Sequence, residues 1–188
     1  MLNIFHIETN NFVNGIGNRF VIWLQGCNLG CPECWNKQTW SMAANTLTSV
    51  DSLLNRIENK PGIKGVTFTG GEPFLQAKEL SMLARLIKEK TELSIHIFTG
   101  YELNELADCY QKELLKYTDT LVTGRFDTSI RNNNQKTHYL NAHSPAWGFN
   151  NSDVEIDIDE NNNVIMTGYP TDELVSGLEG VLDDRIYD

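Results

Sequence analysis

Three closely spaced cysteines constrain this chain more than any other feature of its sequence. Cys27, Cys31 and Cys34 lie in the segment GCNLGCPECWN with C-x3-C-x2-C spacing, and no fourth Cys or His follows at zinc-finger distance. Three thiolates leave one position of a metal site open. An iron–sulfur cube held by three cysteines has one iron free for an exogenous ligand, whereas electron-carrier clusters normally use four. The triplet therefore predicts cluster chemistry on a bound small molecule.

A glycine-containing turn follows a short β-branched run further along the chain. The run covers residues 65–69, and Gly70-Gly71-Glu72-Pro73 comes directly after it. Paired glycines at the carboxyl end of a strand let a ligand approach the backbone closely, and a glutamate accepts hydrogen bonds from an ammonium group. The turn therefore predicts a site for an amino-acid moiety.

In this order the two motifs resemble the radical S-adenosylmethionine (SAM) superfamily. The resemblance implies that Cys27, Cys31 and Cys34 hold a 4Fe–4S cluster. It implies that SAM chelates the fourth iron through its amino and carboxylate groups, with the GGEP stretch at the amino group. It also implies that SAM is cleaved reductively to methionine and a 5′-deoxyadenosyl radical, which abstracts a hydrogen atom. That radical chemistry belongs to the cofactor.

Three further stretches resemble the activating enzymes of glycyl radical enzymes, in particular the compact type that serves anaerobic ribonucleotide reductase. They are GIGNR at 15–19, CWNKQTW at 34–40 and FTGY at 98–101, and they cover much of residues 12–127. The resemblance implies a large glycyl radical enzyme as partner and a flavodoxin- or ferredoxin-type protein as reductant. It implies cofactor contacts from Glu33, Trp35, Asn36, Gly70, Gly71, Glu72, Pro73 and Thr99.

Two positions depart from the superfamily pattern. Many members place an aromatic residue that packs on adenine directly before the third cysteine, where this chain has Glu33, followed after the cysteine by Trp35. Members with a longer barrel place an Asp near the end of a later strand, where this chain has Thr123-Gly124-Arg125. We expect no carboxylate there.

Several other residues have a structural interpretation beside a functional one. His6 and His96 are expected to be structural or surface histidines, although either can complete a metal site in principle. Arg19 is either a buried ion-pair partner or a contact to SAM. Cys109 is expected to be a small buried side chain, because free cysteines are often buried. Trp40, beside the cluster segment, is expected to shield the cluster from water.

Composition limits the possible classes of protein. The 188 residues, 40% of them hydrophobic, suffice for one core, so we expect a single domain with a core near 12–127 and an extension at 128–188. A formal charge of −10 argues against a nucleic-acid surface. With no membrane-length apolar run and no signal-peptide pattern, we expect a soluble cytoplasmic protein without a membrane partner.

The pattern of elements predicts an α/β fold with a parallel sheet curled into a partial (βα) barrel, with ligand loops at the carboxyl ends of its strands. Residues 126–150 read as an irregular loop, which either lines the substrate opening or is a solvated connector. Residues 153–167 predict a β-hairpin, followed by a short acidic tail. The expected strands are 20–24, 66–69, 93–98 and 120–122, and the expected helices are one capped by Thr48, 76–90 and 102–116.

Three functions remain open at this point. The chain either activates a glycyl radical enzyme, or modifies a peptide or small molecule by radical SAM chemistry, or binds a cluster or zinc without being an enzyme. The GGEP stretch at residues 70–73 weighs against the third.

Overall fold

The computed structural model describes residues 1–127, 135–141, 154–158, 164–168 and 170–179. Its elements, in chain order, are β1 (Leu2–Asn11), β2 (Arg19–Leu24), η1 (Lys37–Thr39), β3 (Thr46–Thr48), α1 (Val50–Glu58), β4 (Gly65–Gly70), η2 (Pro73–Gln76), α2 (Ala77–Lys90), β5 (Ser94–Phe98), η3 (Leu103–Glu105), α3 (Cys109–Tyr117), β6 (Thr120–Thr123), β7 (Lys136–Tyr139), β8 (Val154–Ile158), β9 (Val164–Gly168) and α4 (Asp172–Glu179). No helix in these segments is long and apolar enough to span a membrane.

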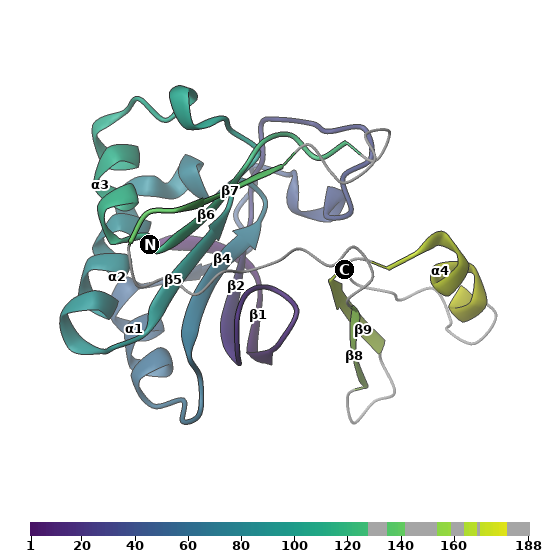
Figure 1. Ribbon diagram of the computed structural model, residues 1–188, viewed down its shortest axis with the longest axis horizontal. Coiled ribbons are helices and arrows are strands. Elements are labelled where there is room, and N and C mark those ends of the chain that lie inside the picture. Colours follow the sequence, from purple (N-terminus) through teal and green to yellow (C-terminus); the bar gives the residue numbers. More distant parts are fainter. Residues whose placement is uncertain (128–134, 142–153, 159–163, 169, 180–188) are drawn as a thin grey trace.

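A seven-stranded sheet with the order β3-β1-β2-β4-β5-β6-β7 forms the centre of the molecule. Strands β2, β4, β5 and β6 are mutually parallel, as the sequence predicts, and the flanking strands pair antiparallel to them. Helices α1, α2 and α3 lie on one side of the sheet, whereas β8, β9 and α4 lie on the other (Figure 1). Parallel strands connected by helices bring their carboxyl ends to one edge, which is where both sequence motifs fall.

The helices pack on the sheet through the apolar faces that their periodicity predicts. In α1, Leu53, Leu54 and Ile57 are buried, and α2 buries Leu80, Leu83, Ala84 and Ile87 in the same way. The predicted cap of α1 is wrong by one residue. Thr48 ends β3, and it is the Ser49 hydroxyl that accepts a hydrogen bond from the Ser52 N–H (3.1 Å).

The single helix predicted over residues 102–116 is wrong. A short 3-10 turn, η3, is followed by a break, and α3 begins only after Asp108, whose carboxylate caps the helix by accepting from the Tyr110 N–H (2.8 Å). Cys109 is therefore the first residue of α3. It is exposed, not buried as expected, since residues 107–110, where the helix begins, are all exposed.

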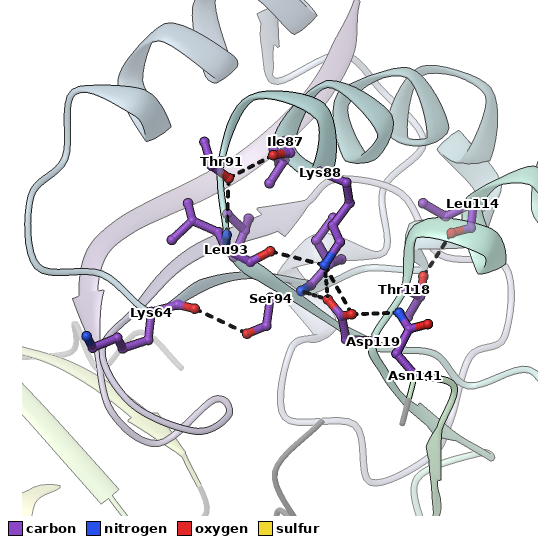
Figure 2. A network of polar contacts seen from close by, with 12 residues as sticks. Lys64, Ile87, Lys88, Thr91, Leu93, Ser94, Leu114, Thr118, Asp119 and Asn141 are labelled. Carbon is purple, nitrogen blue, oxygen red and sulfur yellow. Dashed lines mark hydrogen bonds and ion pairs between the residues drawn. The ribbon is translucent and has the colours of Figure 1, made fainter. Parts of the chain in front are cut away.

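Strand β7 corrects the prediction that residues 126–150 form an irregular loop. Lys136–Tyr139 pairs antiparallel with β6, while residues 128–134 and 142–150 lie outside the described part of the chain. The polar KTHY sequence carries no apolar alternation to signal a strand. A network around Asp119 fixes the far end of β7 instead (Figure 2). The Asp119 carboxylate accepts from Lys88 Nζ (2.9 Å), the Ile95 N–H (2.7 Å) and Asn141 Nδ2 (2.6 Å).

Arg19 joins the amino ends of three parallel strands. Its guanidinium is buried and donates to Thr67 Oγ1 (3.0 Å), the Val66 carbonyl (2.7 Å) and Ser94 Oγ (2.6 Å). Burial lowers its pKa to about 10, partly offset by the charge of Asp119. These contacts are to neutral groups at the end of the sheet away from the cysteines, so Arg19 stabilises the sheet.

His96 and His6 have the structural roles that the sequence predicts. His96 is buried and stacks on Phe98 with ring centroids 4.7 Å apart, and burial lowers its pKa well below the usual value. The His6 ring packs against the Trp23 ring, with ring centroids 5.5 Å apart.

The C-terminal strands β8 and β9 pair antiparallel with each other and attach to the end of β1. Asn11 Nδ2 donates to Thr167 Oγ1 (3.0 Å), and the Phe12 N–H donates to Glu155 (2.8 Å). The residues connecting β8 and β9, 159–163, lie outside the described part, as do residues 180–188 of the expected acidic tail. Helix α4 occupies the stretch just before them.

Candidate functional site

The cysteine loop leaves the sheet directly after β2, and its base is closed by hydrogen bonds. The Gly26 N–H donates to the Thr39 carbonyl (2.7 Å), and the Cys27 N–H donates to the Trp40 carbonyl (3.2 Å). The Gln25 side chain donates to the Thr39 (3.1 Å) and Ser41 (2.7 Å) carbonyls. The CWNKQTW segment therefore returns to the strand end and holds both ends of the loop together.

The three thiols of this loop are free, partly exposed, and line a single open cavity. Burial raises the pKa of the Cys27 thiol, with smaller contributions from the charges of Glu72 and Cys34, while backbone N–H groups of the loop lower it. Within the described residues, no three Cys, His, Asp or Glu side chains are grouped to hold one metal ion. A 4Fe–4S cube presents a different iron to each cysteine, so its ligands need not meet at one point. Three free thiols around an open cavity fit such a cube.

The glycine turn packs on the base of the cysteine loop. A Cβ on Gly70, whose φ is +94°, would lie 2.5 Å from the Leu24 N, and a Cβ on Gly71 would lie 2.3 Å from the Gly26 carbonyl oxygen. The Gly71 and Glu72 N–H groups donate to the Leu24 and Gly26 carbonyls, both at 2.8 Å. The sequence interpretation ascribed these glycines to close approach of a ligand. In the structure, the close approach of protein backbone already requires them.

Glu72 connects the ends of β4 and β5. Its side chain is 1% exposed, and its carboxylate accepts from the Phe74 N–H (2.9 Å), Thr99 Oγ1 (2.8 Å) and the Gly100 N–H (2.9 Å). Burial raises its pKa to about 7, although these hydrogen bonds act in the opposite direction. A carboxylate has about four acceptor positions, so roughly one remains for a ligand ammonium.

The loop after β5 supports the cysteine loop from a second side. A Cβ on Gly100 would lie 2.3 Å from Leu29 Cδ1, and the Tyr101 hydroxyl donates to Asn28 Oδ1 (3.0 Å). Arg125 lies over the Tyr101 ring, 5.6 Å from its centroid, and forms an ion pair with Glu105. The cysteine loop is thus held by the ends of β2, β4 and β5 together.

Most of the residues predicted for the site line this one cavity. Glu33 and Pro73 do not: Glu33 is exposed, and Pro73 is buried as the first residue of η2. Trp40 does not line it either; its side chain is half-buried, and its Nε1 has no hydrogen-bond partner among the described residues. The predicted residues that do line the cavity are Cys27, Cys31, Cys34, Trp35, Asn36, Gly70, Gly71, Glu72 and Thr99.

The cavity has further walls that sequence reasoning missed. Phe126 follows β6, and Thr167 and Gly168 come from β9, far along the chain. No local pattern signals that β9 reaches the cavity. Trp23 is buried in the core, yet it also borders the cavity. Asn14 also lines the cavity. The only feature of the sequence that could have indicated this is its position directly before the GIGNR motif at residues 15–19.

A loop of three free thiols beside a glycine-rich strand end, at the carboxyl edge of a parallel sheet, defines an iron–sulfur protein of the radical SAM class. Comparison with known protein families supports this class. Residues 13–142 match the family described as "4Fe-4S single cluster domain". Because this match spans most of the chain, the protein belongs to the 4Fe-4S single cluster domain family. It is a radical SAM enzyme, and its cofactors are a 4Fe–4S cluster and SAM.

Curated relatives specify the class further. The chain is 32% identical over 135 residues to the anaerobic ribonucleoside-triphosphate reductase-activating protein of Enterobacteria phage T4, covering 69% of this chain and 84% of the relative. It is 30% identical over 146 residues to the protein of that name from Escherichia coli K12, covering 69% and 94%. It is 35% identical over 127 residues to the pyruvate formate-lyase-activating enzyme of Clostridium pasteurianum, covering 65% and 51%.

The chain is also similar to solved structures, among them QueE from Escherichia coli. QueE is 26% identical to this chain over 53% of this chain and 52% of its own, with a TM-score of 0.40.

Proposed function

We propose that this enzyme activates anaerobic ribonucleoside-triphosphate reductase by installing a glycyl radical on it. The observation that carries the proposal is the single open cavity lined by all three thiols and by the glycine turn. Relatives that this chain matches over most of their own length carry the name of anaerobic ribonucleoside-triphosphate reductase-activating proteins. Among the described residues this cavity is open on one side, which leaves room for a segment of another protein.

The roles of individual residues follow from their places around the cavity. Cys27, Cys31 and Cys34 would hold the cluster through three of its irons. A cluster held there would supply the single electron for reductive cleavage of bound SAM to methionine and a 5′-deoxyadenosyl radical, and that radical would take a hydrogen atom from the partner's glycine. The chain's own groups bind and orient SAM and keep water away from it.

The amino-acid end of SAM would lie at the glycine turn. Glu72 has an acceptor position left for the ammonium, and its other hydrogen bonds, from Thr99 among others, fix its orientation. Trp35 and Asn36 face the same cavity from the cysteine loop and would contact the remainder of SAM; the buried Asn36 Oδ1 has no partner among the described residues. From its place outside the cavity, Pro73 would act only by shaping the turn, and Glu33 only from the rim.

The proposed unit is the chain as one radical SAM domain, with a core near 12–127 and an extension at 128–188. We infer that the parallel strands with α1, α2 and α3 form part of a (βα) barrel, because right-handed crossovers curl such a sheet. Strands β8 and β9, the proposed C-terminal hairpin, would then close one side of the cavity, since Thr167 and Gly168 line it. A flavodoxin- or ferredoxin-type protein would supply the electron.

The test is radical transfer to the reductase itself. Enzyme reconstituted anaerobically with iron and sulfide is mixed with SAM, a reductant and the anaerobic reductase, and the glycyl radical is followed by electron paramagnetic resonance. We expect a glycyl signal, with about one 5′-deoxyadenosine formed per radical. Efficient cleavage of SAM with no glycyl signal on the reductase would instead assign the enzyme to a peptide or small-molecule substrate.

A further inference from the structure

Strand β7 lacks the burial that anchors its neighbour β6 in the sheet. None of the four residues of β7, Lys136–Tyr139, is buried, whereas all four residues of β6 are. Burial of apolar side chains is the main favourable term in folding. The position of β7 therefore depends on polar contacts more than the position of β6 does.

Asp119 supplies polar contacts at the far end of β7. Its main-chain carbonyl accepts from the Leu140 N–H (2.9 Å), and its carboxylate accepts from Asn141 Nδ2 (2.6 Å) (Figure 2). The same carboxylate is 10% exposed and is held by Lys88 Nζ (2.9 Å) on α2 and by the Ile95 N–H (2.7 Å) on β5. Hydrogen bonds to an ionised group are stronger than those between neutral groups. The Asn141 amide thus ties the end of β7 to a charged group that α2 and β5 fix in place.

The other end of β7 reaches the cavity. Gln135 directly precedes the strand and lines the cavity, and its Nε2 donates to the Gly124 carbonyl (3.1 Å) just after β6. Phe126, two positions after Gly124, lines the cavity as well. Gln135 and Asn141 are six positions apart, which corresponds to about 20 Å along a strand. Because β7 pairs with β6 in one continuous register, a change at the Asp119 end moves the cavity end too.

The wall formed by Phe126 and Gln135 lies on the opposite side of the glycine turn from the place proposed for SAM. In this part of the sheet the strand order is β2-β4-β5-β6-β7. SAM would extend from the turn after β4 toward Trp35 and Asn36 in the loop after β2. Strand β7 is three strands from β4 in the other direction, which is up to about 14 Å at the usual strand spacing. This wall is therefore left for the substrate.

We propose that Asn141 is a positioning residue, which fixes β7 through Asp119 and so holds Gln135 where the partner's glycine-bearing segment binds. The assignment rests on the proposed function and names the wall of the cavity that this segment contacts. Asn141 is itself exposed and does not line the cavity, so it acts through the strand. Loosening β7 weakens binding of the partner and leaves the cysteine loop and the SAM site as they are.

The experiment separates positioning of β7 from general destabilisation. Asn141→Ala deletes the amide, and Asn141→Asp places a second carboxylate against that of Asp119. Thr118→Val is the matched control, because it removes a hydrogen bond directly beside Asp119, from Thr118 Oγ1 to the Leu114 carbonyl (2.9 Å), without touching β7. For each enzyme we measure the free energy of unfolding in urea and hydrogen exchange of residues 136–140. After reconstitution we measure iron content, the Kd of SAM, and KM and kcat for the anaerobic reductase from the glycyl signal.

We expect the amides of β7 to exchange faster in both Asn141 variants. Their KM for the reductase should rise about tenfold, the size of one hydrogen bond to a charged group, and more in Asn141→Asp because like charges repel. Iron content, kcat and the Kd of SAM should stay within about twofold of the wild type, as for most surface substitutions. Thr118→Val should lower the free energy of unfolding and leave the KM unchanged.

Four results would overturn the proposal. Unchanged exchange of β7 would show that Asn141 does not anchor the strand. Faster exchange with an unchanged KM would show that the partner does not contact this wall. A Kd of SAM that weakens together with the KM would assign the wall to SAM. A KM that rises equally in Thr118→Val would reduce the effect to general destabilisation.

A wild-type enzyme that yields no glycyl radical would overturn the proposed function, and the assignment of Asn141 with it. A wild-type enzyme that does yield one, alongside Asn141 variants with an unchanged KM, would overturn the assignment alone.

Discussion

Gly71→Ala tests whether the glycine turn holds the cysteine loop in place. The new Cβ would lie 2.3 Å from the Gly26 carbonyl oxygen, whereas real contacts are essentially never under 3.0 Å, so the backbone must separate by at least 0.7 Å. Two hydrogen bonds of 2.8 Å join the same segments, from the Gly71 N–H to Leu24 and from the Glu72 N–H to Gly26. Each is worth about 1 kcal/mol net, and overpacking adds about 1–3 kcal/mol, so we expect the free energy of unfolding to fall by about 3–5 kcal/mol.

Because Gly26 directly precedes Cys27, this displacement should also lower iron content after anaerobic reconstitution. The assay is the iron-to-protein ratio together with the free energy of unfolding in urea. Gly30→Ala is the control, since it lies in the same loop with φ of +60° and has no atom within 4 Å of the new Cβ. Its strain alone should cost about 1–2 kcal/mol and leave iron binding intact. A Gly71→Ala enzyme with wild-type iron content and stability would refute the packing argument.

Three further outcomes are expected. The usual pKa of a glutamate is near 4.5, and burial raises the pKa of Glu72 to about 7 in the folded protein. As pH rises, the unfolded chain therefore releases this proton before the folded protein does. Stability should therefore fall by up to about 3 kcal/mol as pH rises from about 4.5 to about 7, and Glu72→Gln should flatten this dependence in urea titrations at several pH values. Arg19→Lys should cost about 3 kcal/mol in the same assay and retain the cluster, because one ammonium cannot reproduce a planar fork that bonds to Thr67, Val66 and Ser94. Cys109→Ser should leave iron content unchanged, since Cys109 is exposed on α3; a loss of iron would add it to the ligand set.

The sequence predicted the parallel strands and the first two helices, because short stretches of sequence carry the pattern that forms them. The parallel strands are short β-branched runs buried on both faces, and the periodicity of α1 and α2 shows directly in Leu and Ile spacing. The flanking strand β7 carries no such pattern, because its pairing depends on β6 and on the Asp119 network. The helix break before α3 depended on the Asp108 cap, which apolar periodicity alone does not reveal.

The residues of the site likewise fall into those that the sequence could predict and those that it could not. Motif residues on the loops after β2, β4 and β5 were predictable, since the carboxyl ends of adjacent parallel strands must meet. The contributions of Thr167 and Asn14 were not, because they depend on a contact between β9 and the end of β1 that joins residues far apart in the sequence. The sequence also could not show why residue 71 must be glycine, since only the folded structure shows that the Gly26 backbone occupies the space where a Cβ would lie.

The most direct test of the central claim is low-temperature electron paramagnetic resonance of the reduced, reconstituted enzyme with and without SAM. The account predicts about four irons per chain and a cluster signal that changes when SAM is added. Replacement of any one of Cys27, Cys31 and Cys34 by Ala should abolish that signal. Stoichiometric zinc without iron in anaerobically purified protein, or a cluster signal that SAM leaves unchanged, would contradict it.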